Sequence, residues 1–196
     1  MEVGSHCYHH PSLYNIPPKD AAEECLEMRK VLEKTLQHPV ISFGYPNGYR
    51  PAYDMDGDYL LRAVKAAGYW SGRTTDTAEE TVESYRDLLA MNSNGFFGYA
   101  KELERDWAKT ITKEGGVFYF WGHSWQIGKT DEQWQKFETF VAQFANQPNT
   151  WYASQGELSL WLWAHKNVKL DIVSKSPAKV GLGERMDLGH VGSTQA

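Results

Sequence analysis

Three histidines lie close together near the start of the chain, in the stretch SHCYHH. His6 and His10 are four residues apart, so a helical turn after a strand would place both imidazoles on one side. Neutral imidazole is a common ligand of zinc and similar cations, and such a pair can bind one cation. The alternative is a pair of solvated or capping histidines. His9 would point elsewhere, and Cys7, a soft ligand by type, suits a small buried position better.

A further histidine ends an apolar stretch in FWGHSW. The neighbours of His123 are Phe120, Trp121 and Trp125, which would remove part of its hydration and so disfavour the charged imidazolium. A histidine whose pKa is tuned near neutrality can act as a general acid. The alternative is a core histidine that bonds to a backbone carbonyl.

Two loop-like stretches between these histidines contain turn residues. GYPNG at 44–48 predicts a turn, whose backbone N–H groups could stabilise an oxyanion. DMDGD at 54–58 resembles the start of a calcium loop but lacks the later ligands, so a helix N-cap cluster is the better interpretation. The chain has no glycine-rich phosphate loop and no G-x-S-x-G motif, which leaves a serine hydrolase without support.

The elements that would position these residues alternate between strand and helix, which predicts parallel strands joined by helical crossovers. In such folds, function lies beyond the carboxyl ends of the strands. The stretches 6–10, 44–48 and 123–125 each follow a predicted strand, so we expect them to converge on one face. The predicted strands are 1–5, 39–46, 69–75, 117–123, 149–154 and 167–173, and the predicted helices are 19–37, 58–68, 98–112, 156–166 and one from Asp131.

Composition limits the classes of function. The 196 residues carry a net charge of −5 without a Lys/Arg cluster, which argues against a nucleic-acid partner. No apolar run approaches the roughly 18–20 residues that span a bilayer. Two cysteines are too few for a disulfide framework. The 8 Trp, 11 Tyr and 8 Phe form either a bulky core or a cleft on which sugar rings stack.

The order of motifs resembles the polysaccharide deacetylases (carbohydrate esterase family 4). EVGSHCYHHPSL is similar to their metal-binding motif His-Ser/Thr-x-x-His, and FGYPNG is similar to Arg-x-Pro-Tyr-Gly. AGYWSGRTT resembles the strand that follows, FYFWGHSW the late histidine motif, and WYASQGEL the closing strand and helix. The resemblance spans about residues 1–165.

The resemblance implies an α/β fold, a distorted (β/α)7-type barrel that here lacks its first strand–helix–strand segment. The barrel domain is expected at 1–173, and a loosely structured tail at 174–196. The activity implied is hydrolysis of acetyl groups from an acetylated amino sugar or polysaccharide, with zinc or another first-row divalent metal.

The same resemblance assigns roles to individual residues. His6 and His10 become the metal ligands, the backbone N–H of Asn47 supports the oxyanion, and His123 is the general acid. The expected substrate-binding residues are Tyr45, Phe120, Trp121 and Trp125.

The chain departs from the family pattern at several positions. The Thr-Phe-Asp-Asp motif, which supplies the base and the third metal ligand, is absent, and the chain begins after its expected place. Gly44 replaces the family arginine, Asn47 the tyrosine and Cys7 the Ser/Thr, and the Asp-x-x-Asp-Trp motif is not evident. Substitute carboxylates are sought among four aspartates: Asp54, Asp56, Asp58 and Asp76.

These departures leave three hypotheses: a working metal-dependent deacetylase, a non-catalytic remnant that binds carbohydrate, and a non-sugar amide hydrolase of the same superfamily. A barrel without its first strands exposes sheet edges, so a homodimer through those edges is expected, and solution mass tests it. The chain as it stands predicts a cytoplasmic protein, whereas a lost upstream segment would permit a secreted or envelope-associated one.

Overall fold

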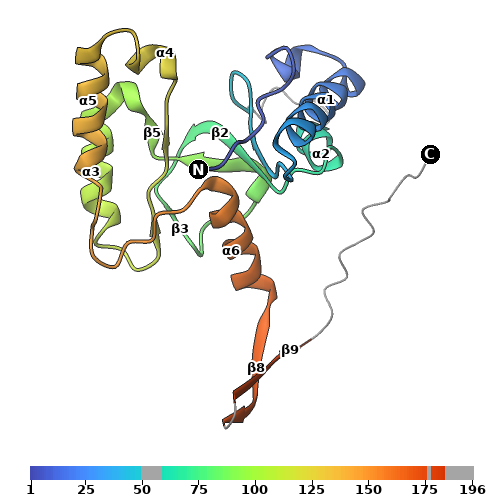
Figure 1. Cartoon of the computed structure of the whole chain (residues 1–196), viewed down its shortest axis with the longest axis vertical. Helices are drawn as coiled ribbons and strands as arrows, with labels where there is room; N and C mark the ends of the chain where they lie inside the picture. Colours follow the sequence, from blue (N-terminus) through green and yellow to red (C-terminus); the bar gives the residue numbers. More distant parts are fainter. Residues whose placement is uncertain (50–58, 176–177, 184–196) are drawn as a thin grey trace. The chain divides into compact units, whose positions relative to one another are not determined.

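The computed structural model describes residues 1–49, 59–175 and 178–183. The chain divides into two compact units, Met1–Ser159 and Leu160–Ala196. Figure 1 traces the elements of each unit. The helices are α1 (Pro18–Leu36), α2 (Tyr59–Ala66), α3 (Ala100–Thr110), α4 (Ser124–Ile127), α5 (Asp131–Ala142) and α6 (Gln155–Asn167), with short 3-10 helices at Leu13–Asn15, Leu88–Ala90 and Phe97–Tyr99.

A parallel sheet organises the first unit. The strands are β1 (Ser42–Gly44), β2 (Ser71–Thr77), β3 (Glu80–Thr81), β4 (Met91–Ser93), β5 (Gly95–Phe96), β6 (Gly116–Val117) and β7 (Phe120–Trp121). β1, β2 and β4 pair in that order, both times in parallel, and β5 pairs with β7 in parallel. β3 pairs with β6 in antiparallel orientation. The predicted parallel crossovers are therefore present, whereas the described strands do not close a barrel, so the predicted (β/α)7 barrel is not confirmed.

The predicted strand 117–123 is wrong in its extent, because it splits into β6 and β7 in two different sheets. Asn94 explains the break. Its backbone N–H donates to Tyr119 O at 2.6 Å, and its side-chain oxygen accepts from the Tyr119 N–H at 2.8 Å. A side-chain amide thus takes the place of the next backbone group in the ladder.

Two other predicted strands also differ from the structure. Residues 1–5 contribute one parallel bridge, Ser5 to Phe43, and no longer strand. Residues 149–154 form no strand. The Tyr152 hydroxyl bonds locally, donating to Phe144 O and accepting from the Gln147 N–H. Strand propensity alone therefore does not place this segment in a sheet. The stretch 76–96, in which no strand is predicted, contains β3, β4 and β5.

Helices α1 and α2 lie together on one side of the parallel strands (Figure 1). α1 begins with Pro18 at its first position and ends where Gln37 adopts a left-handed backbone with φ 51°. Its buried face carries Ala21 and Cys25, as the apolar spacing predicts. These helices and β1 enclose one core, which includes Leu13, Val40, Phe43, Tyr45, Leu60, Val64 and Tyr69.

Helices α3 and α5 form a second, largely aromatic core. Leu103, Phe140 and Phe144 are buried there, with Phe97, Trp107, Phe118 and Phe120 packed around them. Thr130 caps α5 by accepting a hydrogen bond from the Gln133 N–H. Much of the aromatic content of the chain therefore serves packing.

The second unit begins within α6 and continues into a hairpin of β8 (Lys169–Lys175) and β9 (Ala178–Gly183). The predicted strand 167–173 matches β8. The expected domain boundary at residue 173 lies inside this strand, and part of the segment expected to be loosely structured forms β9. Among the described residues, no helix is both long and apolar enough to cross a membrane.

Candidate functional site

The site is built where the N-terminal segment leaves the sheet. The Ser5 N–H donates to Ser42 O, and Ser5 O accepts from the Gly44 N–H, each at 2.9 Å. His6 follows at once, and its ring Nδ1 lies 2.6 Å from Gly44 O. A carbonyl oxygen only accepts, so Nδ1 carries the proton and Nε2 presents its lone pair.

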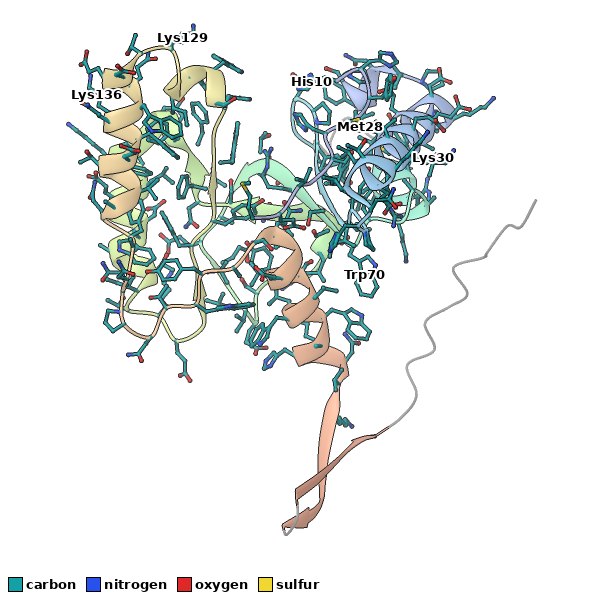
Figure 2. All side chains as sticks on the ribbon, viewed as in Figure 1. His10, Met28, Lys30, Trp70, Lys129 and Lys136 are labelled. Atoms are coloured by element: carbon teal, nitrogen blue, oxygen red, sulfur yellow. The ribbon has the colours of Figure 1, made fainter. Side chains whose placement is uncertain are left out.

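His10 returns to His6 through a left-handed loop. Cys7 and His10 have φ angles of 65° and 57°, and the two imidazole rings meet edge to face at 4.6 Å between centroids. The predicted helical turn is therefore wrong, because the first 3-10 helix begins only at Leu13. The two histidines nevertheless meet, as the spacing predicts. Figure 2 shows His10 on the loop ahead of α1.

Burial lowers the pKa of His6 below the usual histidine value. The hydrogen bond to Gly44 O opposes this shift, and the nearby His10, Arg73 and His123 add to it. His6 is thus held neutral, which is the protonation state that a metal ligand needs.

The neighbours of the histidine pair are held away from it. The exposed His9 ring bonds to a Glu24 oxygen at 2.7 Å, and the backbone N–H groups of Tyr8 and His9 donate to the other oxygen. Burial raises the pKa of Glu24, but these bonds outweigh it and leave the pKa below its usual range. Glu24 therefore anchors the loop.

Cys7 is buried and does not line the site. Its thiol and the Cys25 thiol hydrogen-bond to each other, and this bond together with burial raises the pKa of Cys7 far above the usual thiol value. A thiol that stays protonated is a poor metal ligand and a poor nucleophile. Cys7 therefore has the small buried position that the sequence favours.

The turn after β1 runs from Tyr45 to Gly48. The Gly48 N–H donates to Tyr45 O at 3.0 Å, and Asn47 has a φ of 59°, so the predicted turn is present. The Asn47 side chain donates to Ser12 Oγ at 3.0 Å and ties the turn to the histidine loop. Within the described residues, nothing accepts a hydrogen bond from the Asn47 backbone N–H.

His123 precedes α4, and aromatic rings surround it. It stacks on Trp125 at 5.0 Å and meets Trp121 edge-on at 5.5 Å, with Phe96 at 5.9 Å. Its Nδ1 lies 2.7 Å from the Gln126 side-chain oxygen, so Nδ1 donates and Nε2 remains available. The predicted aromatic surroundings are present, but the partner is a side-chain amide and not a backbone carbonyl.

These separate stretches converge on one cavity of about 520 Å³. It combines imidazoles, a guanidinium, hydroxyls and aromatic rings, and no carboxylate lines it among the described residues. The cavity is lined by His6, His10, Ser12, Tyr14, Tyr45, Asn47, Arg73, Thr75, Trp121 and His123.

Some predicted site residues lie elsewhere. Phe120 packs into the aromatic core, 5.4 Å from Phe140 between ring centroids, because successive side chains of a strand point to opposite faces and Trp121 takes the cavity side. Trp125 stacks on His123 but does not line the cavity. Asp76 is exposed and outside the cavity. The other proposed carboxylates (Asp54, Asp56 and Asp58) lie outside the described residues.

Arg73, Thr75, Ser12 and Tyr14 line the cavity and were not singled out from the sequence. For Arg73, the sequence does contain a signal. It stands in the strand that follows GYPNG, and β2 pairs with β1 so that Arg73 is opposite Gly44. Once the two strands are predicted to be parallel neighbours, alternation puts Arg73 and Thr75 on one face.

The donor set fits a divalent metal in part. His6 and His10 supply two imidazoles, and the bond from His6 to Gly44 O is the type of outer contact that orients a ligating histidine. The part of the chain that the structure describes holds no group of three His, Cys, Asp or Glu side chains able to enclose a metal ion. A metal at this pair would need further ligands from solvent, substrate or residues outside the described ranges.

A second cavity of about 600 Å³ adjoins the first, because Thr75 and Trp121 line both. Phe96 and Tyr99 contribute aromatic surface to it. Glu79, at its edge, bonds to Lys109 at 2.8 Å and to Lys113 at 2.5 Å, and these two bonds lower its pKa to about 2. The cavity therefore has an aromatic wall and a charged rim.

Comparison with known proteins finds similarity over part of the chain. Residues 1–72 match the sequence model of the polysaccharide deacetylase family. Among solved structures, a Streptococcus pyogenes deacetylase, PplD, in complex with acetate is similar at 24% identity and a TM-score of 0.38. That alignment covers 45% of this chain and 36% of the PplD chain. No curated protein matches. The matched residues 1–72 contain both His6 and His10 and the Asn47 turn, and over this segment the chain is similar to the polysaccharide deacetylases.

Proposed function

We propose that the first unit is a deacetylase that hydrolyses the acetyl group of an acetylated amino sugar or polysaccharide, with a divalent metal at His6 and His10. One observation carries the proposal. The histidine pair and the Asn47 turn, both within the family match, share a cavity with His123, which lies 113 residues beyond His10 (123 − 10). Convergence of a metal-binding pair, an oxyanion donor and a proton donor is what acyl hydrolysis requires.

The metal would be held by His6 Nε2 and by the His10 ring. When bound, it supplies Lewis-acid activation of the acetyl carbonyl and of a water molecule. The two imidazoles must be neutral to bind it, and the lowered pKa of His6 keeps that ring neutral. Zinc or another first-row ion suits imidazole ligands.

The remaining steps belong to groups of this chain. The Asn47 N–H donates to the carbonyl oxygen as negative charge develops on it. Water adds to the carbonyl carbon, and His123 Nε2 takes the proton that the water loses. His123 then gives this proton to the amine nitrogen as the C–N bond breaks, so the products are acetate and a free amino sugar. Gln126 keeps the His123 proton on Nδ1 before protonation, so Nε2 is the atom that exchanges protons.

Trp121 provides the apolar wall of the reaction cavity. Its ring lies against His123 and Phe96 and faces the cavity that the histidines line. A flat indole excludes water from the reacting centre, which strengthens the electrostatic interactions there. Of the four expected substrate-binding residues, Trp121 and Tyr45 line this cavity, whereas Phe120 lies in the core and Trp125 lies outside the cavity.

Metal stoichiometry is the first test. The full chain, purified and reconstituted with zinc, is expected to bind about one ion per chain. His6→Ala should lose it, whereas His9→Ala, which changes the exposed neighbour, should keep it. A wild-type chain that binds no metal would contradict the metal-dependent mechanism.

Activity is tested by acetate release from N-acetylated glucosamine oligomers. His123→Asn should lower kcat by about 10²–10⁴-fold, the usual contribution of a general acid, while the metal content stays unchanged. A metal-loaded wild-type chain that binds the oligomers without releasing acetate would replace the proposal with the carbohydrate-binding alternative.

A further inference from the structure

Arg73 brings a half-buried guanidinium into the cavity of the three histidines. Its Cα is the cross-strand partner of Gly44, and a Cβ at Gly44 would lie 3.2 Å from an Arg73 terminal nitrogen and 3.4 Å from His6 Nδ1. The missing side chain at position 44 therefore makes room for the guanidinium. The arginine that the family resemblance places at position 44 is here supplied by the neighbouring strand.

The guanidinium is held by groups that do not neutralise it. It lies over the Trp121 ring at 4.7 Å, and Nη1 donates to Thr74 O at 3.3 Å. It also donates to the Tyr119 hydroxyl, which in turn donates to Gln155 Oε1 at 2.7 Å. Burial lowers the pKa of Arg73, and Tyr119 partly offsets this. An arginine stays charged even so.

No acid accompanies this cation in the part of the chain that the structure describes. No described carboxylate lies within 4 Å of the guanidinium, and the described cavity lining holds imidazoles instead. A half-buried charge without a counter-ion loses part of its hydration without compensation, and a guanidinium has five N–H donors, of which the contacts above use two. The cavity therefore favours an anionic ligand.

We propose that Arg73 is the carboxylate-binding residue of this cavity. A carboxylate would accept hydrogen bonds from the guanidinium beside the His6 ring, with Trp121 shielding the pair from water. The planar guanidinium can donate two parallel N–H bonds, which match the two oxygens of a carboxylate. The carboxylate has two sources, acetate released in the proposed deacetylation or an acidic side chain of the protein. The acetate source rests on the proposed function, whereas carboxylate binding itself does not require turnover.

Acetate binding is measured on the full chain by calorimetry, before and after treatment with a chelator, with neutral acetamide as the matched probe. Acetate but not acetamide should bind in both states. Arg73→Gln should weaken acetate binding about tenfold or more, the loss expected for a charge-assisted hydrogen bond. Because the chelated protein cannot deacetylate by the proposed route, failure of the enzyme and failure of this site are separate results.

Two further variants distinguish loss of the binding site from misfolding and test where the guanidinium must lie. Arg73→Lys keeps the charge but loses the fork, so it should bind acetate more weakly than wild type and more strongly than Arg73→Gln. The exchange Gly44→Arg with Arg73→Gly moves the guanidinium from β2 to β1 and should restore acetate binding. Circular dichroism establishes that each variant is folded.

The second source gives a different pattern. If an acidic side chain already occupies the site, wild type ignores acetate, but its stability falls more steeply than that of Arg73→Gln as pH drops below about 4, where a paired carboxylate takes up its proton. Either pattern supports a carboxylate at Arg73. The proposal is overturned if Arg73→Gln leaves acetate binding and the pH dependence of unfolding equal to wild type.

Discussion

At the scale of single residues, the state of His6 links the site to pH. Its pKa in the folded chain lies below that of the free side chain, chiefly because the ring is buried. As pH falls through about 6.5, the unfolded chain gains the proton first. Below this pH the unfolded chain is stabilised relative to the native state, because the native His6 binds a proton less readily. The contribution of His6 therefore favours the native state at higher pH and is lost as pH falls.

A His6→Gln variant tests this sign. In urea unfolding of the metal-free chain, wild type should lose more stability than the variant between pH 7.5 and 5.5, because only wild type carries the depressed histidine. His38→Gln, at an exposed position, is the matched control and should keep the wild-type pH dependence. Equal slopes for wild type and His6→Gln would show that burial of His6 does not shift its titration.

At the scale of elements, the turn after β1 depends on close packing against β2. Gly48 has a φ of +83°, and a Cβ there would lie 2.1 Å from Thr75 Oγ1. The same turn presents Asn47 to the cavity, so the geometry of the proposed oxyanion donor depends on this glycine.

Gly48→Ala should therefore destabilise the chain by about 1–3 kcal/mol, from left-handed backbone strain and from the clash. In a Thr75→Ala background the clash with Oγ1 disappears, a close contact with the Cβ at 3.1 Å stays, and the backbone strain remains, so the cost should shrink to about 1–2 kcal/mol. A cycle of four unfolding curves measures both parts. An equal cost in both backgrounds would show that the Thr75 contact carries no energy.

The two residues of strand β7 have different roles, because Phe120 packs against the aromatic core and Trp121 lines the cavity. Phe120→Ala should lower stability, by less than the about 3–5 kcal/mol of a fully buried phenylalanine, because the half-buried ring packs against the aromatic core. Trp121→Ala should instead impair ligand binding in the cavity, with a smaller loss of stability, since its ring lines both cavities and is not packed within the aromatic core. Thermal unfolding and acetate titration of the pair decide this, and the reverse pattern would mean that the strand faces are assigned the wrong way round.

At the scale of the first unit, two cavities share Trp121 and Thr75 and together offer more room than one sugar ring needs. Tyr99 is 63% exposed on the wall of the second cavity, with Phe96 at 6.2 Å between ring centroids. Exposed aromatic rings of this kind suit the faces of pyranose rings.

Tyr99→Ala should therefore weaken binding of a chito-oligomer by about 1 kcal/mol, roughly fivefold, and leave binding of the single sugar unchanged. Trp151→Ala removes a similarly exposed ring outside both cavities and serves as control. Affinities from fluorescence or calorimetric titration give the answer, and an equal loss for monomer and oligomer would refute the extended site.

How much could be predicted differs between parts of this unit. Helices α1, α2, α3 and α5 follow from apolar spacing and caps, and β1 from a β-branched run between prolines, because these signals act within a few residues. The strand predicted at 149–154 is absent, because strand propensity is realised only where a neighbouring strand is present to pair with it. The strand at 117–123 failed because Asn94, distant in sequence, interrupts it.

The sequence by itself determined which residue types could do chemistry and that the stretches carrying them would meet. The spacing of His6 and His10, the GYPNG turn and the position of His123 at the end of an apolar stretch are local facts, and parallel alternation brings strand ends together. Three features were decided only by the tertiary structure. Residues with a left-handed backbone conformation, and not a helix, join the two histidines. Phe120 faces the core, and the Arg73 side chain lies next to Gly44. These depend on strand register and long-range packing, which no local pattern encodes.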